Sequence, residues 1–334
     1  MLASTFRYIS GIRRQTEAKL WREGIISLDE LLENEVKQLG LFGSSPNPKA
    51  AQIESFKALI NSKDFEALAE LLDTEDYYRV ALQFPEDTIF LDIETTGLSR
   101  FYDKITLVGW RSAAAYGVYI RGGNPGAFLY ALERASVVVT YNGTTFDLPF
   151  ILKEFPNAQL PPVHVDLRYL SKRVGLTGGQ KTVEQLIGVS RPKEVSAVDG
   201  EYAPVLWAQY RRGSVEAMET LIQYNHADVF GLCAIFDHSV RQLLQGLEVP
   251  DSFLQKLPRF AYAVPLRLKT DTVSRTSRND VISIFPYVTS DHSFVTLRSL
   301  YKAIGRVALT IVGIDLTGSE ARPSGWCKLF LISG

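Results

Sequence analysis

The sequence has few of the residues that build disulfide frameworks or structural zinc sites. Among its 334 residues only Cys233 and Cys327 are cysteines, and there are four histidines. No Cys-x-x-Cys pair and no histidine-rich run occurs, so neither a disulfide framework nor a structural zinc site is indicated. This usage fits a reducing compartment, and we expect the protein in the cytoplasm.

Long apolar segments are also missing. No run of 18 apolar residues occurs anywhere, and the opening MLASTFRYISGIRRQ lacks the apolar stretch of a signal peptide. We therefore expect no membrane span. The sequence shows neither a repeat of solenoid period nor a low-complexity tract.

An excess of charge of one sign is lacking as well. The formal net charge of -1 excludes a uniformly basic surface, so any contact with nucleic acid must use local patches. Two segments are locally basic. The stretch 168–212 has eight basic residues against four acids, and 257–334 has ten against five. Solvated surface charge is an alternative explanation for either patch taken alone.

With 46% hydrophobic residues, the chain can bury at least one sizeable core. Residues 1–80 are predicted to form a helical domain, with Ser27 as a helix cap and Glu30 three residues later. This region resembles half of a helix-hairpin-helix module, which holds a nucleic-acid phosphate on backbone N–H groups. Arg13 stands where that module has its second glycine, so a plain helical packing domain is the alternative.

From Pro85 onward, short apolar runs alternate with helical patterns, which predicts an α/β domain at 85–246. We expect an antiparallel meander of strands at 88–94, 105–111 and 115–120. A fourth strand, 136–141, follows a helix. Residues 247–264 are predicted to be a linker. A basic C-terminal segment at 265–334 closes with two apolar strands.

The run TIFLDIETTGLS at 88–99 places two acids in an apolar strand. The chain has four Asp-x-Glu triplets, and only Asp92 with Glu94 lies in a β-pattern, where both side chains leave the same face. At about 4 Å and an effective dielectric near 20, two such charges repel by roughly 4 kcal/mol. No Lys or Arg lies in the strand. The pair therefore either faces solvent or binds a hard cation such as Mg²⁺ or Mn²⁺.

Further acids occur in fitting surroundings. VVVTYNGTTFDLPFI places Asp147 in the first turn of a helix after the fourth strand, and Tyr224 and Asp228 lie at i and i+4 on an apolar helix. Each has a structural explanation when taken alone. Asp147 is favoured by the helix dipole, and the other two could form an ordinary pair on a helix surface. Together these segments supply four carboxylates and a phenol.

The segments FLDIETTGL, YNGTTFDLPF and YNHAD resemble, in order, the three motifs of the DEDD 3′–5′ exonucleases, which have the ribonuclease H-like fold. The tyrosine four residues before the last Asp matches the tyrosine variant, because the histidine variant needs histidine where Gln223 stands. The segments between the motifs are similar to the YprB-like branch, so the resemblance covers about residues 4–240. It implies a mixed five-stranded sheet, with an antiparallel meander plus parallel strands, and flanking helices.

The resemblance also implies a metal site. Asp92, Glu94, Asp147 and Asp228 would hold two divalent ions, Mg²⁺ or Mn²⁺, and Tyr224 would orient the attacking water or help to deprotonate it. Free tyrosine has a pKa near 10, which favours the orienting role.

Substrate contacts follow from the same resemblance. Thr95, Thr96 and Leu98 would line the path of the terminal nucleotide, and Asn142 would contact the strand or only form a turn. The basic segment 168–193, which includes Arg173 and Lys181, would follow the phosphate backbone of single-stranded DNA or RNA. Asp166 is predicted to be an outer acid of the site or a structural cap.

The sequence thus predicts a metal-dependent 3′–5′ exonuclease that acts on single-stranded ends. The alternatives are a non-cleaving nucleic-acid-binding module with the same fold and a ribonuclease H-like endonuclease. The choice between DNA and RNA stays open, because no sequence pattern identifies a contact to the 2′-OH. The tail IVGIDLTGSEARPSGW resembles the start of a second predicted ribonuclease H-like nuclease family, with Asp315 in place of its first acid. We expect no independent activity there.

Overall fold

The protein is described here from a computed structural model, which covers residues 1–39, 48–113, 115–196 and 200–261. The predicted basic C-terminal segment at 265–334, with Asp315, lies outside the described residues.

A five-stranded sheet forms the centre of the described structure. Its strands are β1 (Thr88–Thr95), β2 (Ile105–Arg111), β3 (Tyr116–Ile120), β4 (Val137–Thr140) and β5 (Val163–Asp166). The order is β3-β2-β1-β4-β5, with β1, β2 and β3 antiparallel and with β4 and β5 parallel to β1. The predicted mixed sheet, a three-strand meander with parallel strands beside it, is confirmed. Strand β1 lies at its centre.

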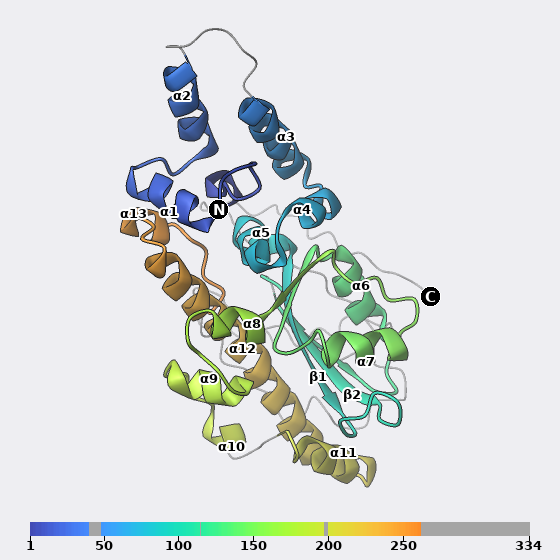
Figure 1. Ribbon diagram of the computed structural model, residues 1–334. Coiled ribbons are helices and arrows are strands. Elements are labelled where there is room, and N and C mark those ends of the chain that lie inside the picture. The colour runs from blue at the N-terminus through green and yellow to red at the C-terminus, as the bar shows by residue number, and fades with distance from the viewer. Residues whose placement is uncertain (40–47, 114, 197–199, 262–334) are drawn as a thin grey trace, which may run out of the picture.

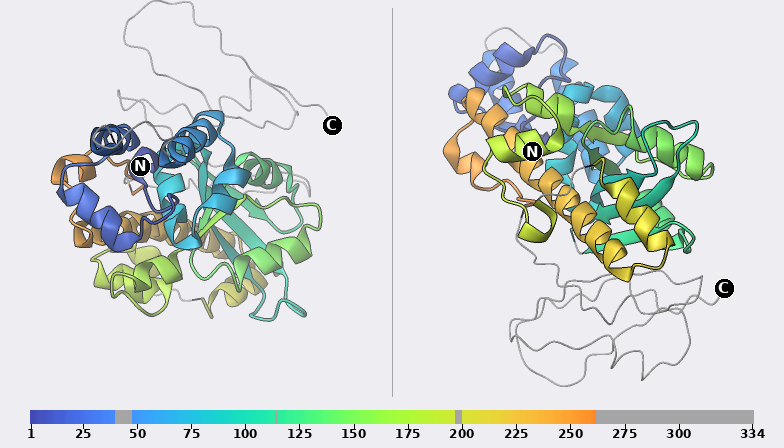
Figure 2. Two further views of the ribbon diagram at one scale, coloured as in Figure 1. Left: turned by 45° about the horizontal axis from the view of Figure 1, so that its top comes forward. Right: turned by 90° about the horizontal axis from the view of Figure 1, so that it is seen from below.

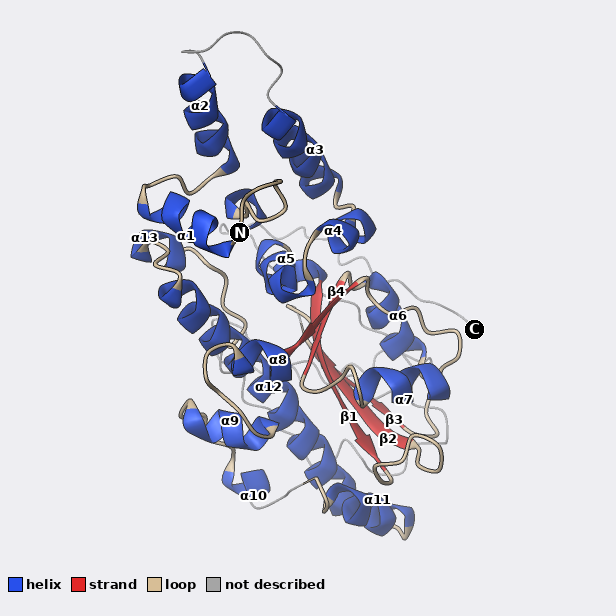
Figure 3. Ribbon diagram, in the orientation of Figure 1, coloured by secondary structure: helices blue, strands red, loops and turns tan. Residues whose placement is uncertain are grey.

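Alternate residues of the central strands face two separate cores. On one face, Leu91 and Ile93 pack with side chains of α6 (Gly126–Arg134) and α7 (Asp147–Glu154). On the other face, Phe90 packs edge-on against Phe236 of α12 (Val215–Gly246), with ring centroids 5.8 Å apart. The sheet therefore lies between two helical layers (Figure 1, Figure 3). The face that carries Phe90 is also the face of residues 92 and 94.

Shorter helices complete the described structure. They are α1 (Arg14–Arg22), α2 (Leu28–Leu39), α3 (Pro48–Ser62), α4 (Phe65–Leu71), α5 (Tyr77–Gln83), α8 (Leu167–Lys172), α9 (Gln180–Leu186), α10 (Lys193–Ser196), α11 (Ala203–Arg211) and α13 (Asp251–Leu254), with 3-10 turns at Leu2–Ser4, Thr74–Asp76 and Pro85–Asp87. Helices α1 to α4 gather at one end of the molecule (Figure 2). None of the described helices combines the length and the apolar character needed to cross a membrane.

Helix α2 begins with the reciprocal cap that its sequence predicts. The Glu30 backbone N–H donates to Ser27 Oγ at 3.2 Å, and the Ser27 N–H donates to Glu30 Oε2 at 2.9 Å. Gly11 and Gly24 take positive φ angles of 86° and 84°, which glycine tolerates without strain. A phosphate-binding role for this region stays a prediction.

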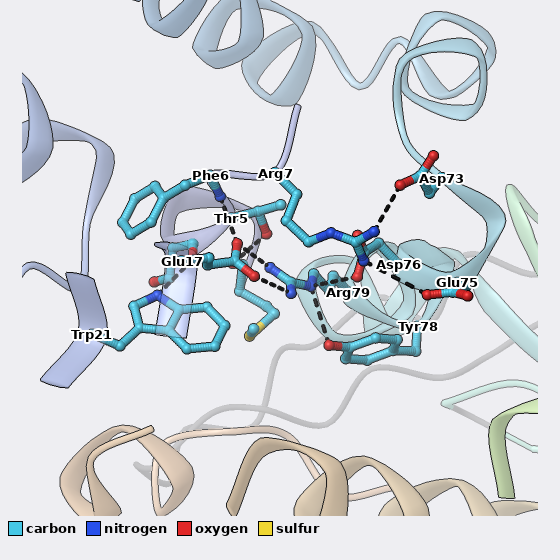
Figure 4. Close-up of polar contacts among 12 residues, drawn as sticks. Thr5, Phe6, Arg7, Glu17, Trp21, Asp73, Glu75, Asp76, Tyr78 and Arg79 are labelled. Atoms are coloured by element: carbon cyan, nitrogen blue, oxygen red, sulfur yellow. Dashed lines mark hydrogen bonds and ion pairs between the residues drawn. The ribbon is translucent and has the colours of Figure 1, made fainter. Parts of the chain in front are cut away.

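A buried ion pair joins the N-terminal helices to the segment that enters the sheet. Arg79 of α5, 1% exposed, donates from Nη1 and Nη2 to the two carboxylate oxygens of Glu17 in α1, at 2.8 and 2.7 Å (Figure 4). Glu17 also accepts the backbone N–H of Phe6 at 2.7 Å. Both partners are buried and are held in a bidentate geometry, which fixes α1 against α5. Helix α5 ends five residues before β1, so this contact sets where the helical region meets the sheet.

The residues after α12 also pack onto the sheet. The Phe260 ring lies 5.0 Å from that of Phe90 and 5.2 Å from that of Phe236, and its carbonyl oxygen accepts a hydrogen bond from Arg111 of β2. The described part of the predicted linker, residues 247–261, therefore covers the edge of the core beside α12.

Replacing Arg79 with Ala should lower the free energy of unfolding by about 3–5 kcal/mol, because it leaves the Glu17 carboxylate buried without a cation. Denaturant titration followed by circular dichroism measures the loss. Arg22→Ala is the matched control, since Arg22 pairs at 3.1 Å with Glu248 while both side chains are more than half exposed. The control should change stability by less than about 1 kcal/mol. Equal losses in the two variants would contradict a special role for the buried pair.

Candidate metal centre

Three of the predicted acids converge where α12 crosses β1. Carboxylate oxygens of Asp92, Glu94 and Asp228 all lie within 4.8 Å of one another. Strand alternation turns the first two acids toward α12, and the helix supplies the third. Glu94 and Asp228 are each 6% exposed. Residues more than 130 positions apart in the chain thus form one acidic cluster.

Asp147 contacts β1 at the edge of the strand that faces β4. Strands β1 and β4 stay paired only as far as Phe90 and Val139, so the backbone of β1 beyond that point has no partner in β4. The Ile93 N–H instead donates to Asp147 Oδ1 at 3.2 Å. Asp147 is 3% exposed and is the first residue of α7. It is not one of the three acids within 4.8 Å, but it is fixed to the strand between two of them.

The electrostatics of the four acids show how crowded they are. Burial raises the pKa of Asp147 to about 7 and that of Asp228 to about 6. Burial, followed by the negative charge of Asp228, raises the pKa values of Asp92 and Glu94 well above their ordinary range. Without a further cation, ionising all four groups at neutral pH is unfavourable. Carboxylate oxygens are the ligands that Mg²⁺ and Mn²⁺ prefer, so this donor set fits a divalent metal ion.

Asn225, which the sequence analysis did not select, holds two of the acids in place. Its Nδ2 donates to Asp92 Oδ2 at 2.8 Å and to Glu94 Oε1 at 3.4 Å, while its Oδ1 accepts from the Tyr116 hydroxyl at 2.9 Å. Gly109 lies opposite Asp92 on β2, and a Cβ there would lie 1.7 Å from the Asn225 oxygen. The glycine at position 109 of β2 thus leaves room for the Asn225 side chain. The position of Asn225 inside the YNHAD segment indicated that it lies near the site, but the sequence alone could not show which way its side chain faces.

Asp228 has a cationic neighbour, Arg191, that the sequence analysis did not select for the site. Arg191 Nη2 donates to Asp228 Oδ1 at 2.6 Å, and the same guanidinium makes a bidentate contact with Glu184 at 2.6 and 2.8 Å. Gln180 Nε2 donates to the Asp228 carbonyl oxygen at 2.8 Å. These contacts bring the loop after α9 onto α12. The Arg191 guanidinium offsets part of the rise in the pKa of Asp228 that burial causes.

Tyr224 lies one turn before Asp228 and is 4% exposed. Lys181 Nζ lies 4.7 Å from its ring centroid, and Arg191 Cζ lies 5.7 Å away. Burial and the nearby carboxylates raise the pKa of Tyr224 above its ordinary value of 10. The phenol is therefore protonated at neutral pH in the protein without bound metal, and it can donate a hydrogen bond. Lys181 is thus close to the predicted site.

The predicted substrate-contacting residues next to β1 lie at its carboxyl end. The Thr95 hydroxyl donates to the Gly97 carbonyl oxygen at 2.6 Å, and the Thr96 hydroxyl donates to Asp103 Oδ1 at 2.9 Å. Leu98 is 86% exposed. Both threonine side chains shape the loop after the strand, whereas Leu98 is open to solvent.

Asn142 begins the turn that precedes Asp147, and Asp166 at the end of β5 accepts a hydrogen bond from this turn. Asn142 has a positive φ of 64°, and its backbone N–H donates to Asp166 Oδ1 at 2.8 Å. Its side-chain oxygen accepts from Arg168 Nη1 at 2.7 Å. Asp166 also accepts the Arg168 N–H at 3.1 Å, so it is a cap of α8, one of its two predicted roles.

A pocket of about 480 Å³ opens beside this turn. Its lining includes Asn142, the basic residues Arg168 and Lys172, and Gln180, which also reaches Asp228, but no acid. Arg173 is not part of the acidic cluster or of this lining. Its Nη1 donates to the Glu75 carbonyl oxygen in the helical region, and its contact with a substrate stays a prediction.

Gly109→Ala should destabilise the protein by about 1–3 kcal/mol and displace Asn225, because the new Cβ overlaps the amide oxygen. Chemical denaturation checks the stability. The control is Gly246→Ala at the end of α12, where a Cβ meets no atom within 4 Å. Its stability should change by less than about 1 kcal/mol. A tolerated Gly109→Ala would show that Asn225 does not need this space.

A divalent ion should stabilise the protein more at about pH 8 than at about pH 5.5. The folded pKa values of Asp147, about 7, and Asp228, about 6, exceed the ordinary value of 3.8. The metal-free fold therefore loses stability as the pH rises from 3.8 through about 7, while the ionised carboxylates gain affinity for a cation.

Thermal unfolding with Mg²⁺ or with EDTA, at both pH values, measures this difference. Asp92→Asn should show a smaller metal effect at the higher pH. A metal effect of the same size at both pH values would count against binding at these carboxylates.

Comparison with known proteins gives one family match. Residues 89–240 match the model of the RNase_H_2 family, described as RNase_H superfamily. No curated protein matches the chain.

Several solved structures are similar at low identity. A family B DNA polymerase from Pyrobaculum calidifontis is 16% identical, with a TM-score of 0.39 over 47% of this chain and 25% of its own. A nuclease in its apo form is 18% identical, with a TM-score of 0.37 over 52% of this chain and 79% of its own. The Aedes aegypti Nibbler EXO domain is 15% identical, with a TM-score of 0.36 over 53% of this chain and 89% of its own.

The present chain thus spans about a quarter of the length of the polymerase. The family match covers all five strands and the four acids. Together with the order and directions of the strands, it shows that residues 89–240 form a ribonuclease H-like domain.

Proposed function

We propose that the protein is a metal-dependent 3′–5′ exonuclease that hydrolyses phosphodiester bonds at single-stranded nucleic-acid ends. The observation that carries this proposal is the convergence of Asp92, Glu94 and Asp228 within 4.8 Å, with Asp147 bonded to the strand between the first two. These are the four acids of the DEDD motifs. The phenol of those motifs, Tyr224, is buried one helical turn from Asp228.

The four carboxylates would hold two divalent ions, Mg²⁺ or Mn²⁺. When bound, such ions act as Lewis acids on phosphoryl oxygens and lower the pKa of bound water. Asn225 keeps Asp92 and Glu94 oriented through its amide hydrogens. Arg191 holds Asp228 from the side of α9.

Tyr224 contributes a hydrogen-bond donor rather than a base. Without bound metal, its raised pKa keeps the hydroxyl proton in place at neutral pH, which suits a group that orients a water molecule. Lys181 beside the ring and Arg191 beside Asp228 add positive charge where a phosphate would approach.

Two features suit a nucleic-acid strand whose end lies at the acids. Thr95 and Thr96 shape the loop at the end of β1, beside Glu94, where the resemblance places the terminal nucleotide. The pocket beside Asn142 carries Arg168 and Lys172, whose charges suit a phosphate backbone.

A non-cleaving binding module with the same fold is the second candidate. The buried cluster speaks against it, because crowding four carboxylates destabilises a fold that gains no metal from them. A ribonuclease H-like endonuclease is the third candidate, and a cleavage assay separates it from an exonuclease by the position of the first cut.

The test uses 5′-labelled DNA and RNA strands of matched sequence, with Mg²⁺, Mn²⁺ or EDTA. The wild-type protein should shorten the labelled strand progressively from its 3′ end, and it should do so only when metal is present. Asp92→Asn and Glu94→Gln should lower the rate by more than about 100-fold, because each removes a metal ligand. Tyr224→Phe should slow hydrolysis while keeping the metal-induced rise in thermal stability.

Glu66→Gln is the matched control, since Glu66 belongs to another Asp-x-Glu triplet but is exposed. It should leave the rate unchanged. A single internal cut would favour the endonuclease, and no cleavage with intact binding would favour the non-cleaving module. Full activity in Asp92→Asn would remove the basis of the proposal.

A further inference from the structure

The loop between β1 and β2, residues 96–104, presents three large apolar side chains to solvent. Leu98 is 86% exposed, Phe101 is 74% exposed and Tyr102 is 87% exposed. They are the most exposed large hydrophobic side chains in the part of the chain that the structure describes. A contiguous group of this kind on a surface marks a binding site more often than chance exposure.

The loop is held in a defined shape. The Asp103 carboxylate accepts from the Thr96 hydroxyl at 2.9 Å and from the Ser99 N–H at 2.9 Å. Lys153 of α7 donates to the carbonyl oxygens of Phe101 and Asp103 at 3.3 and 3.0 Å. The apolar side chains are therefore presented by a braced loop, which lowers the entropy lost when a ligand binds.

The loop starts at the strand end that carries the acids. Glu94 is two residues before it, and the β1–β2 register shifts between Glu94 and Thr95. The Thr96 N–H donates to the Lys104 carbonyl oxygen at 2.9 Å, which closes the loop onto the end of the strand. A nucleic-acid strand whose end lies at the acidic cluster would therefore pass beside this loop.

Charge identifies the kind of ligand. Arg100 Cζ lies 5.0 Å from the Phe101 ring centroid, and Lys104 and Lys153 add two more cations. Asp103 is the only acid of the loop, and its carboxylate is occupied by the contacts within the loop. Exposed aromatic rings among cations are the combination that binds single-stranded nucleic acid, with bases stacked on the rings and phosphates beside the charges.

We propose that Phe101 and Tyr102 form a stacking platform for the bases at the 3′ end of a single strand. The inference rests on the proposed function for the direction of the strand. It extends the substrate contact expected of Leu98 to two aromatic residues that no motif includes. The platform binds bases of any identity, because every base has a π-face.

The experiment measures binding separately from cleavage. Full-length protein carrying Asp92→Asn is titrated with a single strand that has 2-aminopurine at its 3′ end and with one that has it well inside the strand, and fluorescence quenching reports stacking. Affinity is measured in parallel for the same strand with abasic sites in place of the last two nucleotides. Tyr130→Ala on α6 is the matched control, since Tyr130 is 50% exposed and lies outside the loop.

The double variant Phe101→Ala, Tyr102→Ala should lose the quenching and bind the intact strand about 5- to 150-fold more weakly. Its affinity for the abasic strand should match that of the parent protein, because that strand offers no terminal bases to stack. Phe101→Trp should keep the quenching. The Tyr130→Ala control should bind both strands as the parent does.

Three outcomes would overturn the platform. They are unchanged quenching in the double variant, an equal loss of affinity for both strands, and quenching that is strong only when 2-aminopurine lies well inside the strand. The first would leave the loop as a contact surface for a protein partner. Failure of the proposed function is distinguishable, because it appears as a wild-type protein that does not hydrolyse any strand with metal, whereas the quenching is read without catalysis.

Discussion

The mutual repulsion of buried carboxylates at the crossing of β1 and α12 is the constraint on which the rest of the site depends. Asp92, Glu94 and Asp228 lie within 4.8 Å, and burial raises the pKa of each. Such a cluster is unfavourable for folding unless something compensates its charge. A hard divalent ion compensates it best, and the carboxylate oxygens match the preference of that ion.

The surrounding residues keep this cluster in place before any ion arrives. Asn225 donates to two of the acids and is fixed in turn by Tyr116, while Arg191 and Gln180 hold Asp228 from a different part of the chain. The Asn225 amide hydrogens contact the two acids of β1, and the Arg191 guanidinium, from the loop after α9, contacts Asp228. The cluster is thus oriented by donors whose own positions are determined by packing.

The same scaffold explains why the apolar loop after β1 and the basic pocket beside α8 are both associated with the acids. The loop is the direct continuation of the strand that carries Glu94, and the pocket shares Gln180 with Asp228. At the other end of the molecule, the buried pair of Arg79 with Glu17 sets how the N-terminal helices meet the start of β1. Specific polar contacts therefore join the pocket to α12 and the N-terminal helices to α5, the helix that precedes β1.

The sequence by itself determined the sheet and the acids. Alternation in TIFLDIET fixed one strand and one shared face for residues 92 and 94, and the i, i+4 spacing put Tyr224 and Asp228 on one side of a helix, because these periods are local properties of the backbone. Only the tertiary structure decided that Asn225 reaches Asp92 across 133 positions and that Gly109 makes room for it. It also placed Arg191 on Asp228 and Arg173 on the helical region. Such contacts depend on how distant elements pack, and no local period of the chain encodes them.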